Sequence, residues 1–79
     1  MAYRFDPDML RAARAMVGWT QADLAAKSGT GLATVRRQEM DPNYAAQAGP
    51  HAAWALAFQS AGLELETDGA GAVRGIRRK

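Results

Sequence analysis

The segment 20–39, TQADLAAKSGTGLATVRRQE, constrains the fold more than any other part of the chain. It opens with Thr20, a residue type favoured at helix N-caps, and Asp23 three positions later completes a capping-box pattern. Gly29 tolerates the left-handed backbone conformation that ends many helices. The segment therefore predicts a helix over 21–28 that stops at a tight turn.

A second helix is predicted over about 32–39, directly after that turn. Gly31 would be its N-cap, although glycine is a weaker cap than Ser or Asp. The helix carries Arg36 and Arg37 together with small and polar residues. Two helices joined by a short glycine-containing turn, with arginines on the second, are typical of a helix-turn-helix.

Composition limits the kinds of site that the chain can build. Its 79 residues make one small domain, and a hydrophobic content of 48% is ordinary for a folded protein. There is no cysteine, which excludes disulfides and cysteine-ligated zinc. His51 is the only histidine, which excludes a multi-histidine metal site, and we expect no metal or cofactor.

Charge and hydropathy bear on location and partners. No apolar run reaches the roughly 18 residues of a membrane span, and the first residues lack a signal-peptide pattern, so we expect no membrane association and a cytoplasmic protein. The formal net charge is +2 and the pI is about 9.5. These values are compatible with a nucleic-acid partner but do not require one.

The residues before the helix-turn-helix predict one further helix. Asp6 is a favourable N-cap, Pro7 suits the first helical position, and Gly18 provides a stop. The predicted helix covers about 7–17, and residues 1–4 precede it as a short arm.

A loop and a fourth helix are predicted after the helix-turn-helix. Residues 40–50 contain two prolines, an asparagine and a glycine, which favours loop over most of this stretch. A helix over about 51–61 follows, with Trp54 and Phe58 on one face, and Gly62 closes it.

The last part of the chain changes from helical to strand periodicity. Apolar and acidic residues alternate over 63–66, and a glycine-rich turn leads into an extended β-branched run. This predicts a hairpin over about 63–77, with Gly75 marking a bulge. The chain 1–79 is thus predicted to form one mainly α domain of four helices with a C-terminal β-hairpin.

The segment from Leu10 to Glu39 resembles the Cro/cI-type (XRE-family, lambda-repressor-like) helix-turn-helix proteins. The residues that carry the resemblance are Arg14, Gly18, Thr20, Gln21, Leu24, Ala25, Gly29, Val35 and Glu39. The resemblance implies a small lambda-repressor-like helical domain that binds duplex DNA sequence-specifically. It implies a bacterial or phage transcription regulator, most simply a repressor, acting as a homodimer on a palindromic operator.

The resemblance also implies roles for individual residues. Gln21 falls where family members touch phosphate or an adjacent base, and Leu32, Ala33 and Arg37 fall on the base-reading side of the second motif helix. The full implied DNA-contacting set is Gln21, Thr30, Gly31, Leu32, Ala33, Thr34, Arg36 and Arg37. Arg14 and Glu39 match a pair that bridges the first and third helices and is structural.

Three positions depart from the pattern of this family. Gln38 stands where an apolar core residue is common, Thr30 where a small aliphatic is common, and Gly31 where a Ser or Thr cap is usual. The loop at 40–50 is longer than in the family, and the hairpin after Gly62 is an addition to the minimal domain.

Other functions remain open at the level of sequence. Arg36 and Arg37 also suit an ordinary solvated helix face, and the same fold can serve as a protein-interaction or antitoxin-like module. We expect no enzyme, because no catalytic constellation accompanies Glu64, Glu66 and Asp68. The operator, the direction of regulation and any small-molecule effector are not encoded in the motif.

Residues outside the motif have structural interpretations. Trp19, Trp54 and Phe58 are predicted to be core residues, and His51, near a helix start, is predicted to lie at the surface. The terminal residues 77–79 suit a solvated tail or an arm that grips phosphate.

The hairpin has two possible roles. It can pair with the hairpin of a second chain to build the dimer, because an isolated hairpin needs something to cover its apolar face. Alternatively, it folds back on the helix at 51–61 through Leu63, Leu65, Val73 and Ile76.

Overall fold

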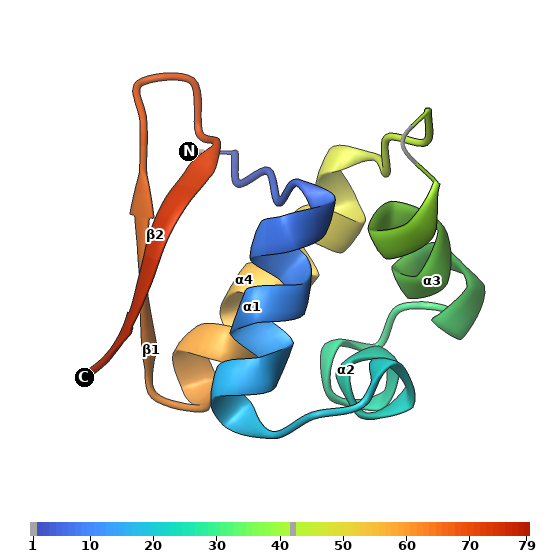
Figure 1. Ribbon diagram of the computed structural model, residues 1–79, viewed down its shortest axis with the longest axis horizontal. Coiled ribbons are helices and arrows are strands. Elements are labelled where there is room, and N and C mark those ends of the chain that lie inside the picture. The colour runs from blue at the N-terminus through green and yellow to red at the C-terminus, as the bar shows by residue number, and fades with distance from the viewer. Residues whose placement is uncertain (1, 42) are drawn as a thin grey trace.

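The computed structural model describes residues 2–41 and 43–79; the rest of the predicted arm and loop, Met1 and Pro42, lies outside the described residues. Its elements are α1 (Pro7–Val17), α2 (Gln21–Ser28), α3 (Leu32–Met40), α4 (Ala48–Ser60), β1 (Leu63–Thr67) and β2 (Val73–Arg78). In Figure 1, α1 and α4 occupy the middle of the molecule, with the hairpin on one side and α2 and α3 on the other. The predicted mainly α architecture with a C-terminal antiparallel hairpin is confirmed.

Local capping residues set the ends of the first two helices. The Asp6 side chain accepts a hydrogen bond from the Met9 N–H at 2.7 Å, which caps α1. The Thr20 hydroxyl and the Asp23 carboxylate each bond the other residue's backbone N–H, which completes the predicted capping box of α2. Gly18 and Gly29 follow the helices with φ of +71°, a conformation that favours glycine.

The fourth helix starts earlier than predicted. Residues 48–50, which the sequence suggested as loop, form the first turn of α4, and Gln47 is its N-cap. Pro50 fits there because the first N–H groups of a helix have no intrahelical acceptor to lose. At the other end, α4 stops at Ser60 and Ala61 forms the C-cap, and α3 runs one residue further than predicted, to Met40.

One hydrophobic core joins all the elements. Its fully buried large side chains are Trp54, Phe5, Phe58, Leu10, Leu24, Leu63, Val35 and Val73. Trp19 is less buried than predicted: its ring stacks on Phe58 with centroids 5.6 Å apart, but the residue is only partly buried at the edge of the core.

The hairpin covers the core of its own chain. Leu63 of β1 and Val73 of β2 are buried, and β1 packs against α4 while β2 packs against α1. Pairing shifts from Glu66–Gly75 to Thr67–Val73, which leaves Arg74 as an extra residue beside the glycine where a bulge was predicted. Folding back, the second of the two possible roles, is therefore what the structure shows.

The described segment before α1 is tied to this hairpin. The Arg4 N–H donates to the Gly71 carbonyl at 2.9 Å, and the Val73 N–H donates to the Arg4 carbonyl at 2.8 Å. Gly71 has φ of +90°, and a Cβ there would lie 1.9 Å from the Ala2 carbonyl oxygen, so this approach requires glycine. From Ala2 onward the predicted short arm thus lies beside the hairpin, and β2 continues to Arg78, into the residues for which a solvated tail or a phosphate-gripping arm was suggested.

Candidate nucleic-acid interface

The helix α3 is held in place by polar side chains that point inward. Gln38 is buried; its amide nitrogen donates to the Phe5 carbonyl at 2.7 Å, and its amide oxygen accepts from the Ala46 N–H at 2.9 Å. The buried amide is tolerated because both its nitrogen and its oxygen have hydrogen-bond partners. This accounts for a polar side chain at a position where the helix-turn-helix family that the sequence resembles commonly has an apolar one. Gln38 thereby ties α3 to the segment before α1 and to the loop before α4.

A buried ion pair joins α3 to α1. Arg14 donates through Nε and Nη2 to the two carboxylate oxygens of Glu39 at 2.6 and 2.7 Å, and through Nη1 to the Trp19 carbonyl at 2.9 Å. The Glu39 side chain is only 1% exposed and that of Arg14 17%. The hydrogen bonds that Arg14 donates to Glu39 raise the pKa of Arg14 above its ordinary value, against the opposing effect of burial. This bidentate geometry fixes the angle between the two helices.

Several residues of the implied DNA-contacting set also serve the scaffold. The Gln21 amide donates to Glu39 Oε1 at 3.2 Å, and the Thr30 hydroxyl oxygen accepts from the Trp54 indole N–H at 3.0 Å. Leu32 is half-buried and packs against the core. Gln21, Thr30 and Leu32 therefore stabilise the two-helix motif from inside, whatever else they contact. Gly31 is exposed as the N-cap of α3, where no side chain caps the helix, and Thr34 is half-buried.

The outward side of α3 is a single continuous face. Its exposed residues are Ala33, Arg36, Arg37 and Met40. Their spacing of i, i+3, i+4 and i+7 puts them on one stripe of the helix. Met40 is 74% exposed and was absent from the set implied by resemblance, although the same spacing in the sequence would have pointed to it.

The two arginines on this face keep their charge uncompensated. Among the described residues neither Arg36 nor Arg37 forms an ion pair, whereas Arg74 pairs with Asp68 at 3.1 Å and Arg77 with Glu64 at 3.4 Å on the hairpin. The α3 face is therefore a local cationic surface on a chain whose net charge is low.

A loop residue missed by sequence analysis borders this face. The guanidinium carbon of Arg37 lies 5.7 Å from the centre of the Tyr44 ring, within range of a cation–π interaction. Tyr44 is held by its own N–H, which donates to the Asp41 carbonyl at 3.1 Å. No local pattern predicted this contact, because Tyr44 lies in the loop between α3 and α4.

His51, predicted at the surface, is buried. Its Nδ1 accepts a hydrogen bond from the Phe5 N–H at 3.0 Å, and its ring stacks on that of Phe5. Burial, aided by the positive charge of Arg4, lowers the pKa of His51, while a backbone hydrogen bond involving Ala46 opposes the shift. His51 is thus a satisfied structural residue. The described residues contain no group of three or more His, Asp or Glu side chains that could hold a metal ion.

Comparison of the chain with protein-family models and with curated proteins finds no match. None of the helices in the described part of the chain has the length and apolar character needed to span a lipid bilayer.

Proposed function

We propose that this chain is a lambda-repressor-like, sequence-specific regulator of transcription that reads duplex DNA with the outward face of α3. One observation carries the proposal: Arg36 and Arg37 stand exposed on a short helix, without ion pairs to any described residue, and the opposite side of that helix is anchored by buried polar contacts. An α-helix fits the major groove, where each base pair displays a distinct set of donors and acceptors. The proposed place of action is the cytoplasm.

The residues on and beside the α3 face divide by their chemistry in the proposal. Arg37 makes a bidentate contact with O6 and N7 of a guanine, the commonest specific contact to DNA. Arg36, beside it, neutralises a phosphate. Ala33 and Met40 offer apolar surface to thymine methyl groups, and Thr34 together with the exposed start of α3 at Gly31 approaches the backbone.

Precise reading requires a fixed helix, and the scaffold supports the proposal on this point. The Arg14–Glu39 pair and the Gln38 amide hold α3 against α1 and the neighbouring loop. Gln21 joins the same network. A base-reading side chain is effective only when its helix is held to within about 0.5 Å of the position that binding requires.

The proposed regulator acts as a homodimer. One helix reads only a few base pairs, which gives a monomer little selectivity. Two heads related by a two-fold axis read half-sites about one DNA turn apart on a palindrome. Occupying such a site across a promoter represses transcription without any further activity.

Selection of bound sequences from a random duplex pool tests the proposal. We expect enrichment of a palindrome, and binding to the enriched site that weakens steeply as salt rises, because phosphate contacts release counterions. The matched control is the double variant Arg36→Ala, Arg37→Ala, which removes only exposed charge and should enrich nothing. If the parent enriches no sequence and shows no salt-dependent binding, the proposal fails and a protein-interaction or antitoxin-like module becomes the better explanation.

A further inference from the structure

The outward face of α4 is unusual for an exposed helix. None of the 13 residues of α4 is Asp, Glu, Lys or Arg, and its only titratable side chain, His51, is buried on the inner side. The exposed side presents Ala52, Leu56 and Ser60, and Leu56 is 66% exposed. A helix that is apolar on most sides is normally buried on most sides. The outer side of α4 is therefore expected to be covered.

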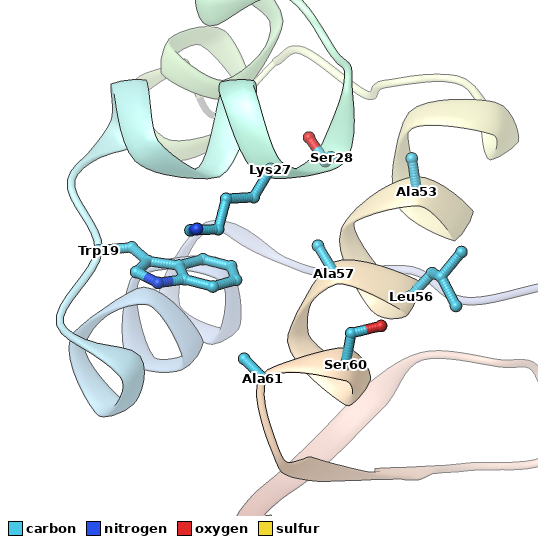
Figure 2. Close-up of a pocket in the computed structure, with 8 residues that line it drawn as sticks. All are labelled: Trp19, Lys27, Ser28, Ala53, Leu56, Ala57, Ser60 and Ala61. Carbon is cyan, nitrogen blue, oxygen red and sulfur yellow. The ribbon is translucent and has the colours of Figure 1, made fainter.

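A groove runs beside this face, between α4 and α2. It has a volume of about 490 Å³, and its lining residues are Trp19, Lys27, Ser28, Ala53, Leu56, Ala57, Ser60 and Ala61. Figure 2 shows Trp19 and Lys27 across the groove from α4, with the small side chain of Ala57 between them and Leu56 and that of Ala61 at the end of the helix. The Lys27 ammonium lies 5.7 Å from the Trp19 ring centre, so the one cation of the groove is already placed over an aromatic face.

Charge argues that the missing cover is a second copy of this chain. In a two-fold interface, residues near the axis meet their own copies, so any charged residue there faces a like charge. A different protein could also place charges of opposite sign across such a contact, and α4 presents no charge for them to pair with. The complete lack of charge along α4 is what a self-pairing helix requires.

Shape supports the same occupant. Leu56 projects next to a groove whose floor is made of alanine methyl groups, which leaves room for a branched aliphatic side chain. A two-fold rotation places the Leu56 of each copy over the groove of the other, so that one ridge and one groove suffice for both halves.

We propose that α4 is the dimerisation helix of this protein, with Leu56 of each copy seated in the α2–α4 groove of the other. The proposal rests on the proposed function, because reading two DNA half-sites requires two copies of α3. None of the α3 face residues Ala33, Arg36, Arg37 and Met40 lines the groove, so seating Leu56 there covers no residue of that face.

The available area sets the expected strength. A stable interface buries about 800 Å² per partner, roughly a sixth of the 4526 Å² that this chain exposes. One helix face and the rim of one groove provide less than that. We therefore expect a dimer dissociation constant on the order of 1–100 µM without DNA. Binding of two chains to adjacent half-sites would then favour the dimer further.

Sedimentation equilibrium without DNA tests the interface independently of DNA binding. The parent should pass from monomer to dimer between about 1 µM and 1 mM. Leu56→Lys should weaken association by about tenfold or more, because it brings a charge into an apolar contact next to the Lys27 of the partner. Met40→Lys is the matched control, since it charges an equally exposed side chain on α3 and should leave association unchanged. Circular dichroism of both variants should match the parent.

A covalent trap gives a second readout. The chain has no cysteine, so Ala52→Cys introduces a single thiol on the proposed interface, and mild oxidation should yield a disulfide-linked dimer. Glu66→Cys on the hairpin should not. A parent that stays monomeric at 1 mM, a Leu56→Lys variant that dimerises like the parent, or trapping only through the hairpin would each overturn the proposal. None of these results bears on base reading by α3. A failure of that proposal would appear instead in the selection of DNA sequences.

Discussion

The outward faces of α3 and α4 differ in what they offer a partner. On α3, two arginines stand without ion pairs among the described residues. The helix α4 contains no Asp, Glu, Lys or Arg, and its one titratable side chain, His51, lies on the buried side. Both helices bury their inner sides in the same core. The contrast suggests that charge divides the surface into two kinds of contact: the cationic face suits a polyanion, and the uncharged face suits a copy of itself.

The largest expected effect is on the scaffold beneath the α3 face. Arg14→Ala leaves the buried Glu39 carboxylate without its guanidinium partner, and we expect a loss of about 3–5 kcal/mol in the free energy of unfolding. Glu39→Ala should cost less, because the more exposed Arg14 keeps its bond to the Trp19 carbonyl. Urea unfolding followed by circular dichroism measures both.

The matched control is Arg74→Ala, which removes an exposed ion pair with Asp68 and should change stability by less than about 1 kcal/mol. If Arg14→Ala unfolds at the same urea concentration as the parent, the pair does not fix α3, and the contrast between a rigid cationic face and the rest of the surface loses its basis.

The second effect is on DNA affinity. Arg37→Ala should weaken binding to the selected site by about 1–3 kcal/mol while leaving the melting temperature unchanged, because the side chain is exposed and makes no ion pair among the described residues. Fluorescence anisotropy with the selected duplex measures this loss. Arg77→Ala, which removes an arginine already paired with Glu64, should have little effect. Equal losses from both variants would mean that net charge, not the α3 face, determines binding.

Sequence predicted the parts of this fold that depend on neighbours in the chain. The caps at Asp6 and Thr20 and the glycines at 18 and 29 set helix ends through contacts within four residues, which a local pattern captures. The turn of Ala48–Gly49–Pro50 was missed because glycine and proline favour loops, and only their position in the first turn makes them compatible with a helix.

Burial of polar residues was beyond local patterns. Gln38 contacts Phe5, 33 positions away, and His51 contacts the same residue from 46 positions away. No periodicity reveals such partners, so His51 was predicted at the surface. At the candidate site, the arginines of α3 and the Arg14–Glu39 pair were identified from resemblance, but the inward roles of Thr30 and Leu32 and the contact of Tyr44 required the three-dimensional structure.

A third expected effect is loss of stability in acid, and it arises at buried His51, which shares Phe5 as a hydrogen-bond partner with Gln38 on the inner side of α3. His51 has a lowered pKa in the folded state, so below its ordinary value of 6.5 the unfolded chain binds the proton more readily. Stability is therefore full above about pH 6.5 and falls as the pH decreases toward the folded-state pKa. Protonation also removes the lone pair of Nδ1 that accepts from the Phe5 N–H.

Thermal unfolding between pH 7.5 and 5 measures this effect. The control is His51→Asn, whose amide oxygen can take the place of Nδ1 as acceptor without titrating in this range. The parent should lose more stability than the variant over this interval. Identical slopes would show that protonation of His51 is not coupled to folding, and carboxylates would then account for the acid sensitivity.

The smallest expected effect concerns the border of the α3 face. The Tyr44 ring under Arg37 restricts the guanidinium to fewer orientations, which lowers the entropy lost when it binds a base. A cation–π contact at an exposed site is worth about 0.5–1 kcal/mol, so Tyr44→Leu should weaken binding to the selected duplex by roughly two- to fivefold. Tyr44→Phe keeps the ring and should bind like the parent. If Tyr44→Phe and Tyr44→Leu weaken binding equally, the loss comes from the hydroxyl group. Tyr44 would then contribute to DNA binding through a hydrogen bond from the loop before α4, and not through its ring beneath Arg37.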